Sequence, residues 1–144
     1  MGSAAKTVDF VKTIFEKTRL SNCFGRCMKN VNLISCEDGK CKAELKIDEE
    51  HLNLAGTLHG GFTSTLVDCV STYALMSSKA GHPGVSVDLH VTFLKPAFPG
   101  DVISIDARTV KAGRTLAFLE VELSKKEDGN LIARGIHTKF IGQG

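Results

Sequence analysis

Apolar positions recur with two different periods along the chain, and the change of period separates its elements. Over residues 8–19 the apolar side chains recur at helical spacing, which predicts an amphipathic helix. From about residue 30 the period falls to two, which predicts strands at 30–36 and 41–47. The Asp38-Gly39 pair between these strands suits a tight hairpin turn, because both residues tolerate positive φ.

A second helix is predicted over residues 61–78, after an irregular loop at 51–60. Its apolar residues lie almost all round the helix, and Asp68 is its one charged residue. A helix of this kind has to be wrapped by other elements. The turn at 81–84, Gly-His-Pro-Gly, then ends it.

Four further strands are predicted after this helix, at 85–95, 101–111, 114–124 and 131–141. In the first of them polar and apolar residues alternate, so Ser86, Asp88 and His90 are expected on one face. The order of the elements indicates an α+β fold, in which the concave face of an antiparallel sheet packs on the apolar helix. We expect residues 1–144 to form a single domain.

The composition is that of an ordinary globular chain, and it excludes several classes of protein. Of 144 residues, 42% are hydrophobic and 24% charged, which excludes a disordered chain. The net charge of +2 is too small to indicate a surface that binds nucleic acid. No apolar run reaches the roughly 18 residues of a membrane span. Five cysteines without a secretory signal predict reduced thiols inside the cell, and their spacings do not match a zinc site. No metal is therefore expected.

The charge is uneven along the chain. Residues 1–30 hold six basic and two acidic side chains, which gives this segment a charge of +4. Two interpretations account for this excess. One is a solvated basic face, and the other is a surface that binds a partner or an anionic membrane.

The start of the second predicted helix is a candidate site for chemistry on a carbonyl group. A helix N-terminus presents unpaired N–H groups and partial positive charge. Because Gly60 and Gly61 carry no Cβ, a carbonyl oxygen can approach these N–H groups, which would stabilise negative charge developing on it. The alternative is that paired glycines only permit a tight turn.

Asp68 follows Gly61 by seven residues, two helical turns, and so falls on the same side of the helix. An isolated carboxylate is costly to bury among apolar residues unless a cleft solvates it. The functional interpretation is a general base or a nucleophile that acts on a nearby carbonyl. The alternative is an acid that faces water from the exposed edge of the helix.

Three neighbouring polar residues allow both functional and structural interpretations. His59 could orient a substrate group or be a packed histidine, and Asn53 could fix a carbonyl or water or be a turn residue. Ser86 could hold an attacking water or be a hydroxyl on a solvated sheet face. The sequence lacks the G-x-S-x-G elbow, the phosphate-binding P-loop and the dinucleotide fingerprint.

The pattern N-x-x-G-x-x-H-G-G at 53–61, followed by Asp68 and by Gly-Val-Ser-Val-Asp at 84–88, resembles the hot-dog acyl-coenzyme A thioesterases. The likeness runs from about residue 8 to the end and includes 111–118 and 137–139. It implies a sheet curled round a central helix, with an additional N-terminal helix. It also implies a dimer with a continuous sheet and a tetramer built from two dimers.

The resemblance also assigns roles to residues. The Gly60 N–H would polarise the thioester carbonyl, which Asn53 and His59 would position. Asp68, from the other subunit, would activate water or attack directly, and Ser86 would orient that water. The residues expected to bind coenzyme A are Ser86, Asp88, Lys95, Lys111, Gly113, Arg114, Thr115 and Lys139.

The predicted function is hydrolysis of medium- to long-chain fatty acyl-coenzyme A, with no metal and no redox cofactor. A lipid-transfer protein is a further expected partner, and the expected location is the cytosol with mitochondrial association. The principal alternative is a binding module that holds acyl-coenzyme A, or a lipid partner, without turnover. A third is hydration of an enoyl thioester, for which the expected catalytic spacing is not evident.

Overall fold

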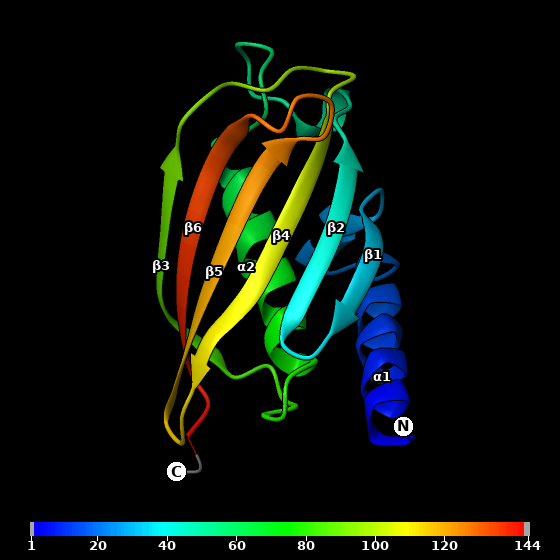
Figure 1. The fold of residues 1–144 in the computed structure, drawn as a ribbon. Coiled ribbons are helices and arrows are strands. Elements are labelled where there is room, and N and C mark those ends of the chain that lie inside the picture. Colours follow the sequence, from blue (N-terminus) through cyan, green and yellow to red (C-terminus); the bar gives the residue numbers. More distant parts are fainter. Residues whose placement is uncertain (1, 143–144) are drawn as a thin grey trace.

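The structure is a computed structural model that describes residues 2–142. Along the chain the elements are α1 (Gly2–Arg19), η1 (Phe24–Met28), β1 (Asn32–Glu37), β2 (Lys40–Lys46), η2 (Glu49–His51), α2 (Gly60–Met76), β3 (Val85–Phe93), β4 (Val102–Ala112), β5 (Leu116–Lys125) and β6 (Leu131–Phe140). One antiparallel sheet takes the order β1-β2-β4-β5-β6-β3, with α2 lying along one of its faces (Figure 1). The predicted α+β architecture is confirmed.

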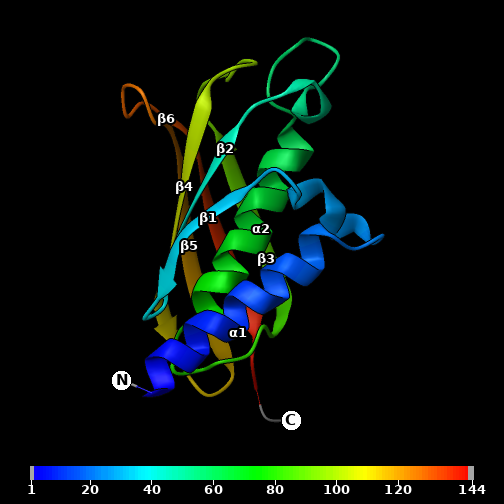
Figure 2. The same ribbon diagram turned by 90° about the vertical axis from the view of Figure 1, so that its right-hand side faces the viewer.

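Helix α2 lies at the centre of the core because it is apolar on most of its surface. Leu66, Val67 and Val70 are completely buried between the helix and the sheet. Helix α1 crosses beside α2 and next to β1 (Figure 2). There the ring of Phe15 meets that of Tyr73 edge-on, with centroids 5.7 Å apart. The first helix therefore buries Val11 and Phe15 as the spacing predicts, whereas Phe10 is 48% exposed. The helix begins at Gly2 and not near residue 8.

Strand β6 approaches α2 closely at Gly135. A Cβ placed there would overlap the side chain of Val67. The missing side chain lets the sheet curl tightly against the helix, and this brings the rest of the inner face of β6 within reach of polar groups on α2.

The β1–β2 hairpin forms as its sequence predicts. Asp38 and Gly39 have φ of 52° and 80°, the left-handed values that a two-residue hairpin turn requires. The alternation on β2 is also confirmed, since Cys41, Ala43 and Leu45 are buried.

Strand β3 forms one edge of the sheet, and its alternation is interrupted. Ser86 pairs with Lys139 and Asp88 with Thr138, so one residue on β3, Val87, has no counterpart on β6. Such a bulge reverses the faces on its two sides. Ser86 therefore shares the inner face with the buried Lys139, whereas Asp88 and His90 lie on the outer face. The prediction that these three residues share a face is wrong, because alternation alone does not reveal a bulge.

Two short helical turns, η1 and η2, were not predicted from the sequence. The second lies just before the loop that leads to α2. Asp48 caps η2 by accepting a hydrogen bond from the Glu49 N–H, and His51 Nδ1 accepts one from the Asp48 N–H. Within residues 2–142 no helix is long and apolar enough to cross a membrane.

Candidate active site

The N-terminus of α2 is capped by a histidine. His59 precedes the helix with extended backbone, and its Nδ1 accepts a hydrogen bond from the Phe62 N–H at 3.2 Å. A neutral ring that accepts at Nδ1 carries its proton on Nε2, so this exposed histidine keeps a free donor. The His59 side chain is exposed in the single chain and is not packed in its core. Gly60, in the first helical turn, keeps an N–H without a partner inside the helix.

A groove of about 360 Å³ opens at this helix end. Gly60, Phe93 and Lys95 line it together with Asn53 and the segment 94–97. A Cβ on Gly60 would lie 3.5 Å from the Phe93 ring, so the absence of a side chain keeps this part of the groove open. The Asn53 amide is bonded within its own loop, donating to Thr57 Oγ1 at 2.9 Å and accepting from the Thr57 N–H at 3.1 Å.

Asp68 lies eight residues beyond Gly60 on α2. At 1.5 Å per residue the two positions are about 12 Å apart along the helix axis. Its side chain is 47% exposed, even though its neighbours Val67 and Val70 are completely buried. Within one chain the acid and the amide cap therefore do not surround a common atom.

A buried polar network lies beneath the Asp68 carboxylate. His137 of β6 is completely buried; its Nδ1 is 2.8 Å from Ser71 Oγ and its Nε2 is 2.7 Å from Ser86 Oγ. Asp68 Oδ1 lies 4.0 Å from the same Nε2. The structure therefore brings Ser86 and Asp68 together around one imidazole ring.

His137 is neutral in this setting. Burial lowers its pKa, the Lys139 ammonium lowers it further, and Asp68 and Asp88 oppose these effects. A distance of 4.0 Å from Asp68 is also too long for a hydrogen bond. The contact is therefore not an ion pair at neutral pH.

The side chain of Lys139 lies on the inner face of β6, not at a turn. It is 4% exposed, and its Nζ donates a hydrogen bond to Thr72 Oγ1 at 2.7 Å. Burial lowers the pKa of Lys139, while Asp68 and Cys69 act in the opposite direction. Thr72 donates in turn to the Asp68 carbonyl oxygen at 2.7 Å. The structure thus places this cation beside the helical turn that carries Asp68.

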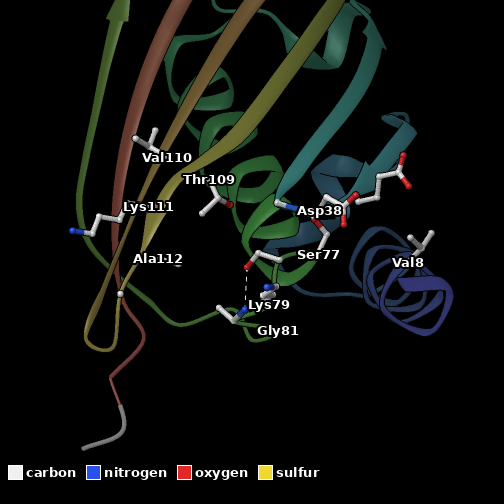
Figure 3. Close-up of a pocket in the computed structure, with 14 residues that line it drawn as sticks. Val8, Asp38, Ser77, Lys79, Gly81, Thr109, Val110, Lys111 and Ala112 are labelled. Carbon is white, nitrogen blue, oxygen red and sulfur yellow. Dashed lines mark hydrogen bonds between the residues drawn. The ribbon is translucent and has the colours of Figure 1, made fainter. Parts of the chain in front are cut away.

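The other residues expected to bind coenzyme A fall at two ends of the molecule. Lys95 lies near Gly60, whereas Lys111 and Gly113 line a groove of about 910 Å³ at the far end of α2 (Figure 3). Arg114 and Thr115 line an adjoining groove of about 600 Å³. Within one chain these two groups lie at opposite ends of the sheet.

No catalytic or binding role was predicted for His137 from the sequence. A signal was present, because alternate residues of the last strand (Ala133, Gly135, His137, Lys139 and Ile141) face the core, and two of them are polar. Polar residues in the buried phase of a strand mark a site that has to be satisfied by hydrogen bonds. Among residues 2–142, no three His, Cys, Asp or Glu side chains gather in a way that could hold a metal ion.

A curled antiparallel sheet around one helix, with a glycine-rich amide cap and an acid on that helix, defines a hot-dog domain of the thioester-cleaving kind. Residues 55–132 match the model of the thioesterase superfamily, and the chain belongs to that family. Human acyl-coenzyme A thioesterase 13 is 50% identical over 119 residues, which cover 83% of this chain and 85% of the relative.

Solved structures agree with this assignment. The crystal structure of zebra fish thioesterase superfamily member 2 superposes with a TM-score of 0.91 at 47% identity, covering 94% of this chain and 98% of that one. A hypothetical thioesterase protein from Streptococcus pneumoniae, solved with coenzyme A, has a TM-score of 0.74 at 28% identity and covers 78% and 85% of the two chains. The roles of individual residues in this chain stay predictions.

Proposed function

We propose that this protein hydrolyses medium- to long-chain fatty acyl-coenzyme A to free fatty acid and coenzyme A. The observation that carries the proposal is the half-exposed Asp68 carboxylate on α2, which lies 4.0 Å from the same His137 nitrogen that Ser86 contacts. The glycine cap of this helix opens into a groove. The relative named acyl-coenzyme A thioesterase 13 supports the choice of substrate.

The active site is shared between two subunits that pair through β3. This edge strand exposes apolar side chains, with Val85 63%, Val87 60% and Phe93 56% exposed. A flat apolar edge is a template for pairing with another strand. Antiparallel pairing about a two-fold axis would place the Gly60 end of one subunit beside the Asp68 and Arg114 regions of its partner.

In this arrangement the Gly60 N–H polarises the thioester carbonyl. Asp68 of the other subunit takes a proton from a water molecule that Ser86 orients, and the water oxygen forms a bond to the carbonyl carbon. The carbon–sulfur bond then breaks, and the coenzyme A thiolate takes the proton that Asp68 accepted from water, which regenerates the carboxylate. The His59 Nε2–H can donate a hydrogen bond to the sulfur as its negative charge develops. Asn53 positions the carbonyl through the loop that it closes with Thr57.

The same pairing accounts for the separation of the coenzyme-binding residues. Lys95 of one subunit and the turn with Lys111, Gly113, Arg114 and Thr115 of its partner would lie along one extended ligand. The cationic groups in both segments suit the phosphates of coenzyme A. Asp88, on the outer face, would meet the ligand only where β3 reaches the interface.

Turnover of acyl-coenzyme A, followed through the released thiol, tests the proposal. Asp68→Ala and Asp68→Asn should lower kcat by about 10²- to 10⁴-fold, the range expected on removing a general base. Asp106→Asn, an exposed acid on the outer face of β4, is the matched control and should leave kcat unchanged. Tight binding of acyl-coenzyme A without any thiol release by the wild type would instead establish a binding module.

Direct attack by Asp68 is the other mechanism open to this acid. A single turnover in heavy-oxygen water would then label the Asp68 carboxylate, whereas general-base catalysis labels only the fatty acid product. We propose the general-base mechanism, because the Ser86 hydroxyl and the Asp68 carboxylate both lie near His137 Nε2, where one water molecule can contact both.

The outer face of the sheet and the N-terminal region suit larger assemblies. Phe118, Ile136 and Phe140 are exposed on β5 and β6, which supports the pairing of two dimers into a tetramer that light scattering would detect.

Leu20 and Phe24 are exposed after the basic helix α1, which supports docking of a lipid-transfer protein there. We propose the cytosol, with mitochondrial association, as the location, which cell fractionation would test.

A further inference from the structure

The contacts around His137 favour one of its two nitrogens as the carrier of the proton. Ser71 Oγ lies 3.1 Å from the Asp68 carbonyl oxygen and 2.8 Å from His137 Nδ1. A carbonyl can only accept, so the one hydroxyl proton of Ser71 has to go to Asp68 if both contacts are hydrogen bonds. Ser71 then accepts from His137, whose proton is on Nδ1.

This assignment settles the direction of the contact at the other side of the ring. With its proton on Nδ1, neutral His137 presents a bare lone pair at Nε2, which can only accept. The Ser86 hydroxyl, 2.7 Å away, therefore donates its proton to the ring. Both lone pairs of the Ser86 oxygen are left to accept hydrogen bonds from other molecules.

We propose that His137 is a positioning residue that turns Ser86 into an acceptor for the attacking water. The inference rests on the proposed hydrolase function. A water held by Asp68 and Ser86 would donate one proton to the carboxylate and one to the hydroxyl oxygen. Its lone pair then has to point away from both, toward the thioester carbon. A Ser86 free to rotate could instead donate to that water and direct the lone pair at itself.

His137 does not itself act as the base. The ring is completely buried and both of its nitrogens are engaged, one by Ser71 and one by Ser86. Its influence on the reaction therefore passes through Ser86, so a change at His137 should have little effect once the Ser86 hydroxyl is removed.

The test is a double-mutant cycle on kcat for a long-chain acyl-coenzyme A. In His137→Asn the shorter amide can still reach Ser71 from the position of Nδ1, but nothing replaces Nε2. We expect kcat to fall about tenfold to a hundredfold, as for Ser86→Ala, with KM nearly unchanged. Adding His137→Asn to Ser86→Ala should cost less than about a further twofold, because the two residues act as one unit. Equal losses in both backgrounds would overturn the inference.

Two further variants separate positioning from general damage to the fold. His137→Gln carries an amide oxygen that can reach the position of Nε2, so it should recover part of the kcat that His137→Asn loses. Asp106→Asn, which changes an exposed side chain on the outer face of β4, should retain wild-type kcat. No recovery in His137→Gln, if it melts like the wild type, would count against the role.

The tautomer can be read without any variant. In protein labelled with ¹⁵N at histidine, the His137 signals should show a protonated Nδ1 and a bare Nε2. A proton on Nε2 would overturn the inference, even if the asparagine variant failed to fold. If Asp68→Ala and Ser86→Ala both retained full kcat, the hydrolase mechanism itself would fail. Normal losses in those variants combined with additive loss in His137→Asn would reject the positioning role alone.

Discussion

Phe93, the last residue of the edge strand β3, lies against Gly60, the first residue of α2. The edge strand β3 thus ends at the amide cap of α2. A second subunit that extends the sheet through β3 would therefore lie beside that cap. Asp68 is about 12 Å further along the helix, which is too far for it to act on a carbonyl held by its own cap. The fold therefore favours an active site completed by the partner subunit.

Subunit mixing should reveal this sharing. Asp68→Ala and Asn53→Ala should each be nearly inactive alone, because each removes one half of every site. After the two are unfolded together and refolded in equal amounts, half of the dimers are mixed, and each mixed dimer regains one of its two sites. We expect about a quarter of the wild-type kcat per subunit. A site built within one chain would give no recovery, since neither type of chain is intact.

A charge on the edge of β3 should separate the subunits. Leu89 pairs with His137 on the inner face of the sheet and remains 38% exposed. Leu89→Lys places an ammonium group in the proposed interface, so light scattering should detect monomers and kcat should fall more than about tenfold. Ile34→Lys, on β1 at the opposite edge of the sheet, should keep both the assembly and the activity.

Much of the fold could be predicted from the sequence, because each element has a local cause. The helical spacing before residue 19, the Asp38-Gly39 turn and the alternation on β2 all depend on neighbouring residues. The bulge at Val87 depends on how β3 pairs with β6, a distant segment, and so the faces of Ser86 and Asp88 could not be assigned correctly.

The site was only partly predictable for the same reason. Gly60 and Asp68 share one helix, and their spacing could be taken from the sequence. His137 reaches Ser86 from 51 residues away and Ser71 from 66 residues away. Lys139 was expected to bind coenzyme A, yet its ammonium donates a hydrogen bond to Thr72 inside the core. Such contacts depend on how the sheet curls round α2, which no local pattern records.

Removing the cations at the turn before β5 should weaken substrate binding and leave the chemical step intact. Lys111→Ala and Arg114→Ala should each raise KM by about three- to tenfold, since one exposed contact to a phosphate contributes about 1 kcal/mol, and kcat should not change. The difference from wild type should shrink at high salt, because screening weakens exposed charge pairs. Lys42→Ala, an exposed lysine on β2, is the control. A fall in kcat with unchanged KM would place the coenzyme elsewhere.

The close approach of β6 to α2 should make Gly135 intolerant of any side chain. Gly135→Ala forces a methyl group against Val67, which we expect to lower the free energy of unfolding by about 1 to 3 kcal/mol in urea titrations. Val67→Ala removes the methyl groups that clash. The double variant Gly135→Ala/Val67→Ala should therefore lose less free energy of unfolding than the two single variants lose together. Simple additivity would show that the tight approach does not determine the packing.

Stability should fall as the pH is lowered from 7 to 5, in part because of His137. Burial lowers the pKa of His137 in the folded state, so the unfolded chain binds more protons once the pH drops below about 6.5. The free energy of unfolding then declines with falling pH until the lowered folded pKa is reached. His51, whose pKa burial also lowers, adds to the same trend.

The contribution of His137 can be isolated from the slope of stability against pH. His137→Asn removes one titrating group, so its slope over pH 5 to 6.5 should be shallower than that of the wild type by at most about 1.4 kcal/mol per pH unit. If the His137→Asn slope matched the wild type, His137 would take up a proton as readily in the folded protein as in the unfolded chain. A neutral ring that accepts from Ser86 would then not persist below neutral pH.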